Sequence, residues 1–156
     1  MFRDMRRIGQ KLREDRCREI LEKAPRVVLS LLGDGGYPYG IPMDFFFEGD
    51  TLYFHCAIEG QKIDAVKACD KASFCVMENG GQEEGDWWYH FESVIVFGRI
   101  SLVEEEAEKT RVLRLIGNKY MPSEEMVEAV LQRSGARAAV LALRIEHMSG
   151  KRVNEK

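Results

Sequence analysis

The hydrophobic pattern changes its period within one short stretch, LYFHCAIEGQKIDAVK, at residues 52–67. Over residues 52–57 the inward positions Leu52, Phe54 and Cys56 alternate with their neighbours, which is typical of a half-buried strand. Ile63 and Val66 then recur at helical spacing, so a short helix is expected to begin near Gly60. The pattern therefore predicts a strand, a tight turn and a helix in succession.

The same analysis divides the rest of the chain into further strands and helices. It predicts helices at 10–23, at 104–119 and after Pro122, and strands at 26–32, 37–48, 72–78, 87–103 and 137–147. Short turns join the strands at 26–32, 37–48 and 52–57, which indicates an antiparallel meander. We therefore expect a mainly β protein with helices, an α+β fold: an antiparallel β-barrel of about six strands with peripheral helices. The chain length fits a single domain over 1–156, with an N-terminal arm and helix at 1–24 and a C-terminal tail at 149–156.

Two of the predicted strands carry unusual features. Pro42 cannot donate a ladder hydrogen bond, so the strand at 37–48 must be irregular or lie at an edge there. The strand at 87–103 begins with three consecutive aromatic residues, which alternation along a strand places on both faces. Its apolar centre predicts cover on both faces, from the barrel interior on one side and from a helix or a second subunit on the other.

The turn near Gly60 has the local chemistry of an anion site. The first N–H groups of a helix have no intrahelical partner, and Lys62 adds a positive charge in that first turn. The alternative is a simple glycine turn followed by a solvated lysine. His55, near the end of the preceding strand, is either a hydrogen-bonded structural residue or a reactive group.

Composition and charge narrow the class of protein. The chain is 45% hydrophobic and 31% charged with a net charge of −3, and its apolar runs are too short for a membrane span. We expect a cytoplasmic protein that contacts neither membrane nor nucleic acid. The cysteines form neither a CxxC pair nor a close cluster, so reduced thiols and no metal site are expected; they are Cys17, Cys56, Cys69 and Cys75.

Three segments together resemble a known family. They are GYPYGIPMDFFFEGDTLYFHCAIEGQKIDAVK at 36–67, SVIVFGRI at 93–100 and RIEHMSGKR at 144–152. Their order and spacing are similar to the pyridoxamine 5'-phosphate oxidase-like flavin-binding family, in particular its nitroimidazole-resistance branch. The resemblance implies a split β-barrel that binds FMN at the interface of a homodimer.

The resemblance also implies roles for individual residues. Gly60, Gln61 and Lys62 would hold the phosphate, and His55 would lie near flavin and substrate as the candidate reactive residue. Gln61 stands where the oxidase branch usually has arginine, which argues against vitamin B6 oxidation. The implied cofactor contacts, in chain order, are Pro42, Met43, Asp44, His55, Cys56, Ala57, Gly60, Gln61, Lys62, Ser93 and Val94.

These expectations lead to one main hypothesis and two alternatives. The main hypothesis is an FMN-dependent, nitroreductase-like enzyme that reduces a small electron-poor organic substrate. The first alternative is a non-catalytic flavin-binding module that senses redox state. The second keeps the fold but uses deazaflavin or haem in place of FMN.

Overall fold

The computed structural model describes residues 2–78 and 80–153, and within them seven strands form one antiparallel sheet. The hydrogen-bonded order is β2-β1-β5-β6-β7-β4-β3, so β2 and β3 are the two edges and the ladder is not closed into a continuous barrel. The strands are β1 (Val27–Leu32), β2 (Pro38–Met43), β3 (Phe46–Glu48), β4 (Thr51–Ala57), β5 (Lys71–Met77), β6 (Phe91–Leu102) and β7 (Ala138–Val153). The α+β class and the antiparallel arrangement are confirmed.

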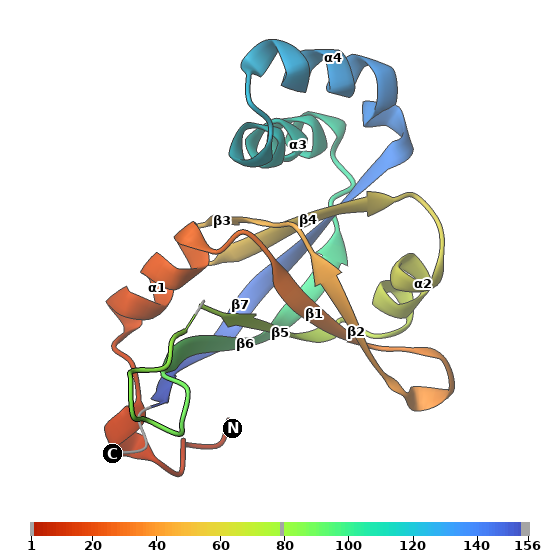
Figure 1. The fold of residues 1–156 in the computed structure, drawn as a ribbon. Coiled ribbons are helices and arrows are strands. Elements are labelled where there is room, and N and C mark those ends of the chain that lie inside the picture. Colours follow the sequence, from red (N-terminus) through yellow and green to blue (C-terminus); the bar gives the residue numbers. More distant parts are fainter. Residues whose placement is uncertain (1, 79, 154–156) are drawn as a thin grey trace.

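Four α-helices surround the sheet in the described part of the chain: α1 (Glu14–Lys23), α2 (Gln61–Ala68), α3 (Glu106–Tyr120) and α4 (Glu124–Ser134). Figure 1 shows α3 and α4 packed together at one end of the sheet, with α1 and α2 well separated from each other. Strand β7 pairs with β4 over Ala138–Arg144, near the α3–α4 end, and with β6 over Leu141–Val153. No helix within 2–78 and 80–153 is both long enough and apolar enough to cross a membrane.

The main core lies between the inner face of the sheet and helices α1 and α2. Strand alternation turns every second side chain inward, so β5 buries alternate residues from Ala72 to Val76 and β6 buries alternate residues from Glu92 to Ile100. Phe45, Phe54 and Phe74 are almost fully buried, and the rings of Phe45 and Phe74 meet edge to face with centroids 5.6 Å apart. Ile20 and Leu21 bring α1 into the same cluster.

The buried Glu92 ties α1 to the sheet through an ion-pair network. It is 8% exposed, and its carboxylate accepts hydrogen bonds from Arg16 Nε at 2.6 Å and from Arg152 Nε at 2.7 Å. Arg16 also donates to Glu78 at 2.7 Å. Burial alone would raise the pKa of Glu92, but the two guanidinium groups outweigh it and hold the pKa below its ordinary value.

Because this pKa is lowered on folding, the network stabilises the fold above the unfolded pKa, and that stability is lost as pH falls through the folded pKa. Glu92→Gln should therefore lower the free energy of unfolding by about 1–3 kcal/mol at neutral pH. It should also flatten the acid side of the stability profile. Urea unfolding at about pH 3 and about pH 7 measures both effects. The exposed Glu22 on α1 provides the control, and a Glu92→Gln profile parallel to that of Glu22→Gln would contradict the role of the network.

Two predicted elements begin or divide differently from expectation. The helix predicted at 10–23 starts only at Glu14, because the N–H of Leu12 bonds the carbonyl of Gly150 on β7 at 2.9 Å. The strand predicted at 37–48 is divided into β2 and β3, which gives seven strands where about six were expected. The cause lies on α3: the Tyr120 hydroxyl accepts the N–H of Phe45 at 3.0 Å and draws this residue out of the ladder.

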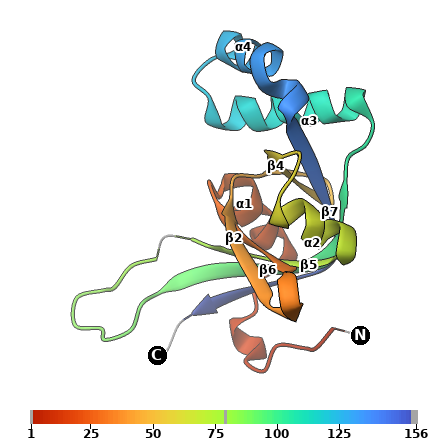
Figure 2. The same cartoon turned by 90° about the vertical axis from the view of Figure 1, so that its right-hand side faces the viewer.

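The long strand and the C-terminal segment also differ from expectation. Strand β6 begins at Phe91, whereas residues 87–89 lie in the connection from β5. This connection, green in Figure 2, projects beyond the end of the sheet. Within the C-terminal tail expected at 149–156, residues 149–153 continue β7 and pair with β6. Residues 154–156 lie outside the described part of the chain.

Candidate functional site

The predicted strand, turn and helix at residues 52–67 are confirmed as the end of β4, a tight turn and α2. Gly60 caps the helix with φ 112° and ψ 174°, a backbone conformation that residues with a Cβ rarely adopt. No atom lies within 4 Å of the position that a Cβ would take there, so the turn faces open space. The N-terminus of α2 is therefore accessible to a ligand.

Lys62 places its positive charge beside this turn without a carboxylate partner among the described residues. Its ammonium group donates to the thioether of Met43 at 3.4 Å, and a thioether is a weak acceptor. The neighbouring Gln61 amide donates to Asp34 at 3.4 Å, which links the turn to the β1–β2 connection. Together with the first N–H groups of α2, Lys62 supplies the donors and the charge that an anion requires.

Cys56 lies on the same side of β4 as this turn and packs against the main core. Burial raises the pKa of its thiol, and the charge of Lys62 acts in the opposite direction. The structure thus brings Met43, Cys56 and Lys62 together, three of the residues that the resemblance assigned to the cofactor. Ala57 ends β4 and is exposed between this group and the turn.

His55 points to the opposite face of β4, because successive side chains of a strand alternate. There it lines a cavity of about 380 Å³ beneath α3 and α4, and Asp44 lines the same cavity. The other walls are mostly apolar and include Leu113, Tyr120, Val127 and Leu131. The sequence grouped His55 and Lys62 in one site, but His55 points away from the face of β4 on which Cys56 meets Lys62 of α2.

Asp44 is held at the rim of this cavity by its neighbours. Its carboxylate bonds the guanidinium of Arg26 at 2.8 Å, and the following residue is fixed by Tyr120, whose hydroxyl donates to the carbonyl of Pro25 at 2.7 Å. The ammonium of Lys119 lies 4.0 Å from the centre of the Phe45 ring, and burial lowers its pKa. Helix α3 thus determines the position of the main chain at 43–45.

Pro42 and Ser93 both face outward from the sheet, with β1 and β5 between their strands. Pro42 pairs with Val28, Val28 with Cys75, and Cys75 with Ile95, so one row of side chains crosses four strands.

Val94 points the other way and is fully buried, so only its main chain is available to a cofactor. The outward face has several exposed apolar side chains: Val28 (43%), Met77 (64%), Ile95 (40%) and Phe97 (40%).

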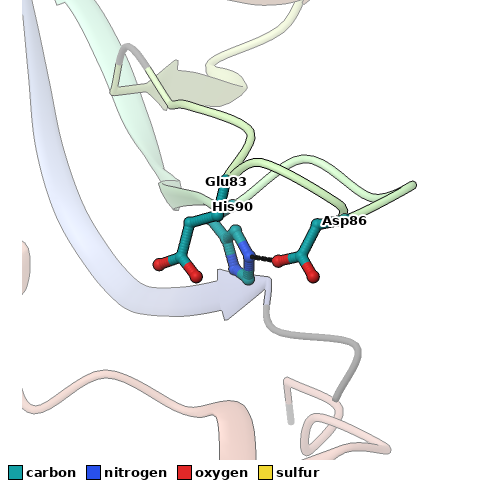
Figure 3. Close-up of side chains that lie close together, drawn as sticks. All are labelled: Glu83, Asp86 and His90. Carbon is teal, nitrogen blue, oxygen red and sulfur yellow. Dashed lines mark hydrogen bonds and ion pairs between the residues drawn. The ribbon is translucent and has the colours of Figure 1, made fainter.

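One cluster was missed by the sequence analysis. In the connection between β5 and β6, Glu83, Asp86 and His90 bring their ligand-type atoms within 4.8 Å of one another (Figure 3). The expectation of no metal site rested on cysteine spacing, and of these three residues only His90 lay in a predicted element, the strand at 87–103. The spacing Glu-x2-Asp-x3-His was the available signal.

Comparisons with known proteins agree with this architecture. Residues 13–152 match the family model described as pyridoxamine 5'-phosphate oxidase. A comparison with curated protein sequences finds no significant match.

Solved structures of similar fold come from several bacteria. One is a candidate 5-nitroimidazole antibiotic resistance protein from Bacteroides thetaiotaomicron, with TM-score 0.75, 23% identity and coverage of 91% of this chain and 86% of that one. A second is the flavocytochrome Anf3 from Azotobacter vinelandii, with TM-score 0.80, 22% identity and coverage of 98% and 76%. A third is an FAD-binding protein from Mesorhizobium loti, with TM-score 0.68, 23% identity and coverage of 93% and 98%. At these identities the likeness concerns the fold.

Proposed function

The chain belongs to the pyridoxamine 5'-phosphate oxidase family, and on that premise we propose that it is a flavoprotein that binds FMN and reduces a small electron-poor organic molecule. The observation that carries the proposal is the accessible N-terminus of α2. Lys62 stands there without a carboxylate partner among the described residues, next to an open glycine turn. This arrangement suits a terminal phosphate.

The residues around α2 fit such a cofactor. Lys62 and the N–H groups after Gly60 would bind the phosphate, and the main chain at 42–44 would bind polar atoms of the ring. Cys56, Ala57 and Ser93 complete the proposed contacts. When bound, the flavin supplies the redox chemistry, whereas the protein orients it and excludes water. Solved structures of similar fold are described as a flavocytochrome and as an FAD-binding protein, which supports flavin binding in general.

The substrate is proposed to enter the cavity beneath α3 and α4. Its volume of about 380 Å³ falls within the range of small-molecule sites. Its walls are mostly apolar, and the ionisable groups that line it are Asp44, His55 and Tyr120. A histidine can hold or donate a proton near neutral pH, so His55 is suited to orient a substrate or to protonate a reduced product.

His55→Ala should spare cofactor binding and lower turnover by about 100-fold, which is within the range for loss of a general acid. The measurement is reductant-driven turnover of a nitroaromatic acceptor, alongside a flavin titration of the same variant. Thr110→Ala is the control, since Thr110 is exposed on α3 and does not line the cavity. Equal loss of turnover and of flavin affinity would make His55 a structural residue. Flavin reduction without any acceptor turnover in the native protein would favour the redox-sensing alternative.

We further propose that the chain forms a homodimer through the outward face of β1, β5 and β6. A contiguous apolar surface on a sheet indicates an interaction site, and here Val28, Met77, Ile95 and Phe97 remain exposed. The proposed contacts Pro42 and Ser93 lie on the same face. A second copy packed there would therefore border the cofactor.

Ile95→Glu should convert the dimer to a monomer, because the interface would bury an unpaired charge in each copy. Light scattering coupled to size-exclusion chromatography gives the mass directly. Thr110→Glu adds the same charge at an exposed position of α3 and should leave the dimer intact. A native protein that is monomeric at micromolar concentration would contradict this interface.

The experiment that tests the proposed function is a visible absorption spectrum of freshly purified protein, followed by chromatography of the cofactor released on denaturation. The expected result is oxidised FMN at about one per chain. FAD, deazaflavin or haem in its place would change the cofactor while keeping the fold. A colourless protein that also fails to bind added FMN would overturn the proposal.

A further inference from the structure

The connection between β5 and β6 gathers three metal-ligating side chains that are not among the proposed flavin contacts. Glu83, Asp86 and His90 come from a hairpin loop that projects beyond the sheet (Figure 2). Figure 3 shows their side chains extending to the same side of this loop, with the two carboxylates on either side of the imidazole. One ligand-type atom from each lies within 4.8 Å of those of the other two.

The loop holds these residues in place with its own hydrogen bonds. His90 and Gly81 exchange two main-chain bonds, of 2.8 and 2.9 Å, which close the base of the hairpin. The N–H of Asp86 bonds the carbonyl of Glu83 at 3.1 Å, and the Gln82 amide donates to the Asp86 carbonyl at 2.5 Å. The main-chain positions of the three residues are therefore set before any ligand arrives.

The Nε2 atom of His90 faces a hydrogen-bond donor and an acceptor at the same time. Neither the neutral nor the charged form of the ring can form good hydrogen bonds with both. The indole N–H of Trp88, which can only donate, lies 2.9 Å from Nε2. An oxygen of Asp86 also lies 2.9 Å from Nε2, and an ionised carboxylate can only accept. If Nε2 carries a proton, its N–H group and the indole N–H of Trp88 point at each other and repel. Without one, the lone pair of the nitrogen faces the carboxylate oxygen.

A cation resolves this conflict, because it binds the imidazole lone pair and the carboxylate oxygen at once. We propose that Glu83, Asp86 and His90 form a binding site for a divalent first-row transition cation, of which Zn²⁺ is the probe. One imidazole and two carboxylates are ligands that such ions accept, and three protein ligands leave a position for water. Ligand atoms around tetrahedral Zn²⁺ lie roughly 3.3 Å apart, so a rotation of the exposed Glu83 side chain completes the site.

The proposed ion has a structural consequence for this hairpin. It cross-links the two sides of the loop beyond the main-chain pair that Gly81 and His90 form at its base. It also takes the Nε2 lone pair from Trp88, so the indole must change its environment. The site departs from the expectation of no metal, which was drawn from the cysteines alone.

The test uses the full chain and two readouts of Zn²⁺ titration: calorimetry for affinity and tryptophan emission for location. Both tryptophans of the chain, Trp87 and Trp88, lie in this loop, so their emission reports on the site. We expect one Zn²⁺ per chain with a dissociation constant in the micromolar range or below, accompanied by an emission change. Loss of a residue that only hydrogen-bonds to a metal ligand typically lowers metal affinity by about 10- to 100-fold. His90 is a ligand itself, so His90→Ala should lower the affinity for Zn²⁺ by at least about 10-fold and abolish the emission change.

Asp86→Asn is the second variant, because it keeps the shape of the loop while weakening one ligand. Glu84→Gln is the matched control: it removes an exposed carboxylate of the same loop that is outside the cluster, and should leave affinity unchanged. Absence of binding in the native protein would overturn the proposal and leave a simple ion pair of Asp86 and His90. So would Zn²⁺ binding that is equally tight in His90→Ala and Asp86→Asn, which would point to the cysteines instead.

Discussion

Replacing Lys62 with glutamate should weaken FMN binding by at least about 100-fold, equivalent to about 2.7 kcal/mol. The native ammonium would lose a charge-assisted contact to the phosphate, worth about 1.5–3 kcal/mol, and the new carboxylate would repel it. The effect cannot be ascribed to a weaker helix. An acidic residue in the first turn interacts favourably with the helix dipole, so α2 itself should be no less stable.

Fluorescence titration of the apoprotein with FMN measures this loss. Lys67→Glu is the matched control, because it makes the same charge change in the last turn of the same helix, where Lys67 is exposed. This control should retain FMN with an affinity close to that of the native protein, and Lys62→Arg should retain most of it. Equal FMN affinities in Lys62→Glu and Lys67→Glu would show that Lys62 does not bind the phosphate. They would not exclude flavin binding at another site.

Replacing Gly98 with alanine should lower the free energy of unfolding by about 3 kcal/mol. Gly98 lies where the β6–β7 register shifts: Phe97 pairs with His147, but Gly98 pairs with Ile145, so one residue of β7 is left over as a bulge. A Cβ at Gly98 would overlap the main-chain carbonyl of Arg144. Since the obstacle is backbone in a central ladder, the clash cannot be relieved by a change of rotamer.

Urea unfolding followed by circular dichroism measures this change. Gly40→Ala provides the comparison, because Gly40 also lies in a strand, and its added Cβ would meet only Val28 and Ser30 at ordinary contact distances of 3.5 and 4.0 Å. That variant should be neutral or slightly more stable, since alanine restricts the unfolded chain. Similar midpoints for the two variants would show that the bulge can relax.

The sequence predicted those elements correctly whose structure depends only on the hydrophobic pattern of a short segment. The change of period at 52–67 predicted β4, the turn at Gly60 and α2, because both periods and the glycine lie within one short segment. The division between β2 and β3 could not be predicted in this way. It depends on a hydrogen bond from Phe45 to Tyr120, 75 residues away in the chain.

In the candidate site too, features that depend on long-range contacts could not be predicted from the sequence. Lys62 and Gly60 were placed correctly relative to each other, because they are neighbours on one turn. The separation of His55 from Lys62 follows from strand alternation, but which face α3 and α4 cover is a tertiary property. The proximity of Glu83, Asp86 and His90 depends on the shape of a loop with little regular structure, which hydrophobic periodicity does not describe.

The pairing of β4 with β7 also has a consequence for synthesis on the ribosome. Strand β4 emerges well before β7, with β5, β6 and three α-helices in between, and it finds its long-range partner only when Ala138–Val153 has been made. Until then one edge of β4 is unpaired, which favours association with other chains. Nascent chains halted within α3 or α4 should therefore bind chaperones more than completed ones, and folding should be slow relative to that of helical proteins of similar size.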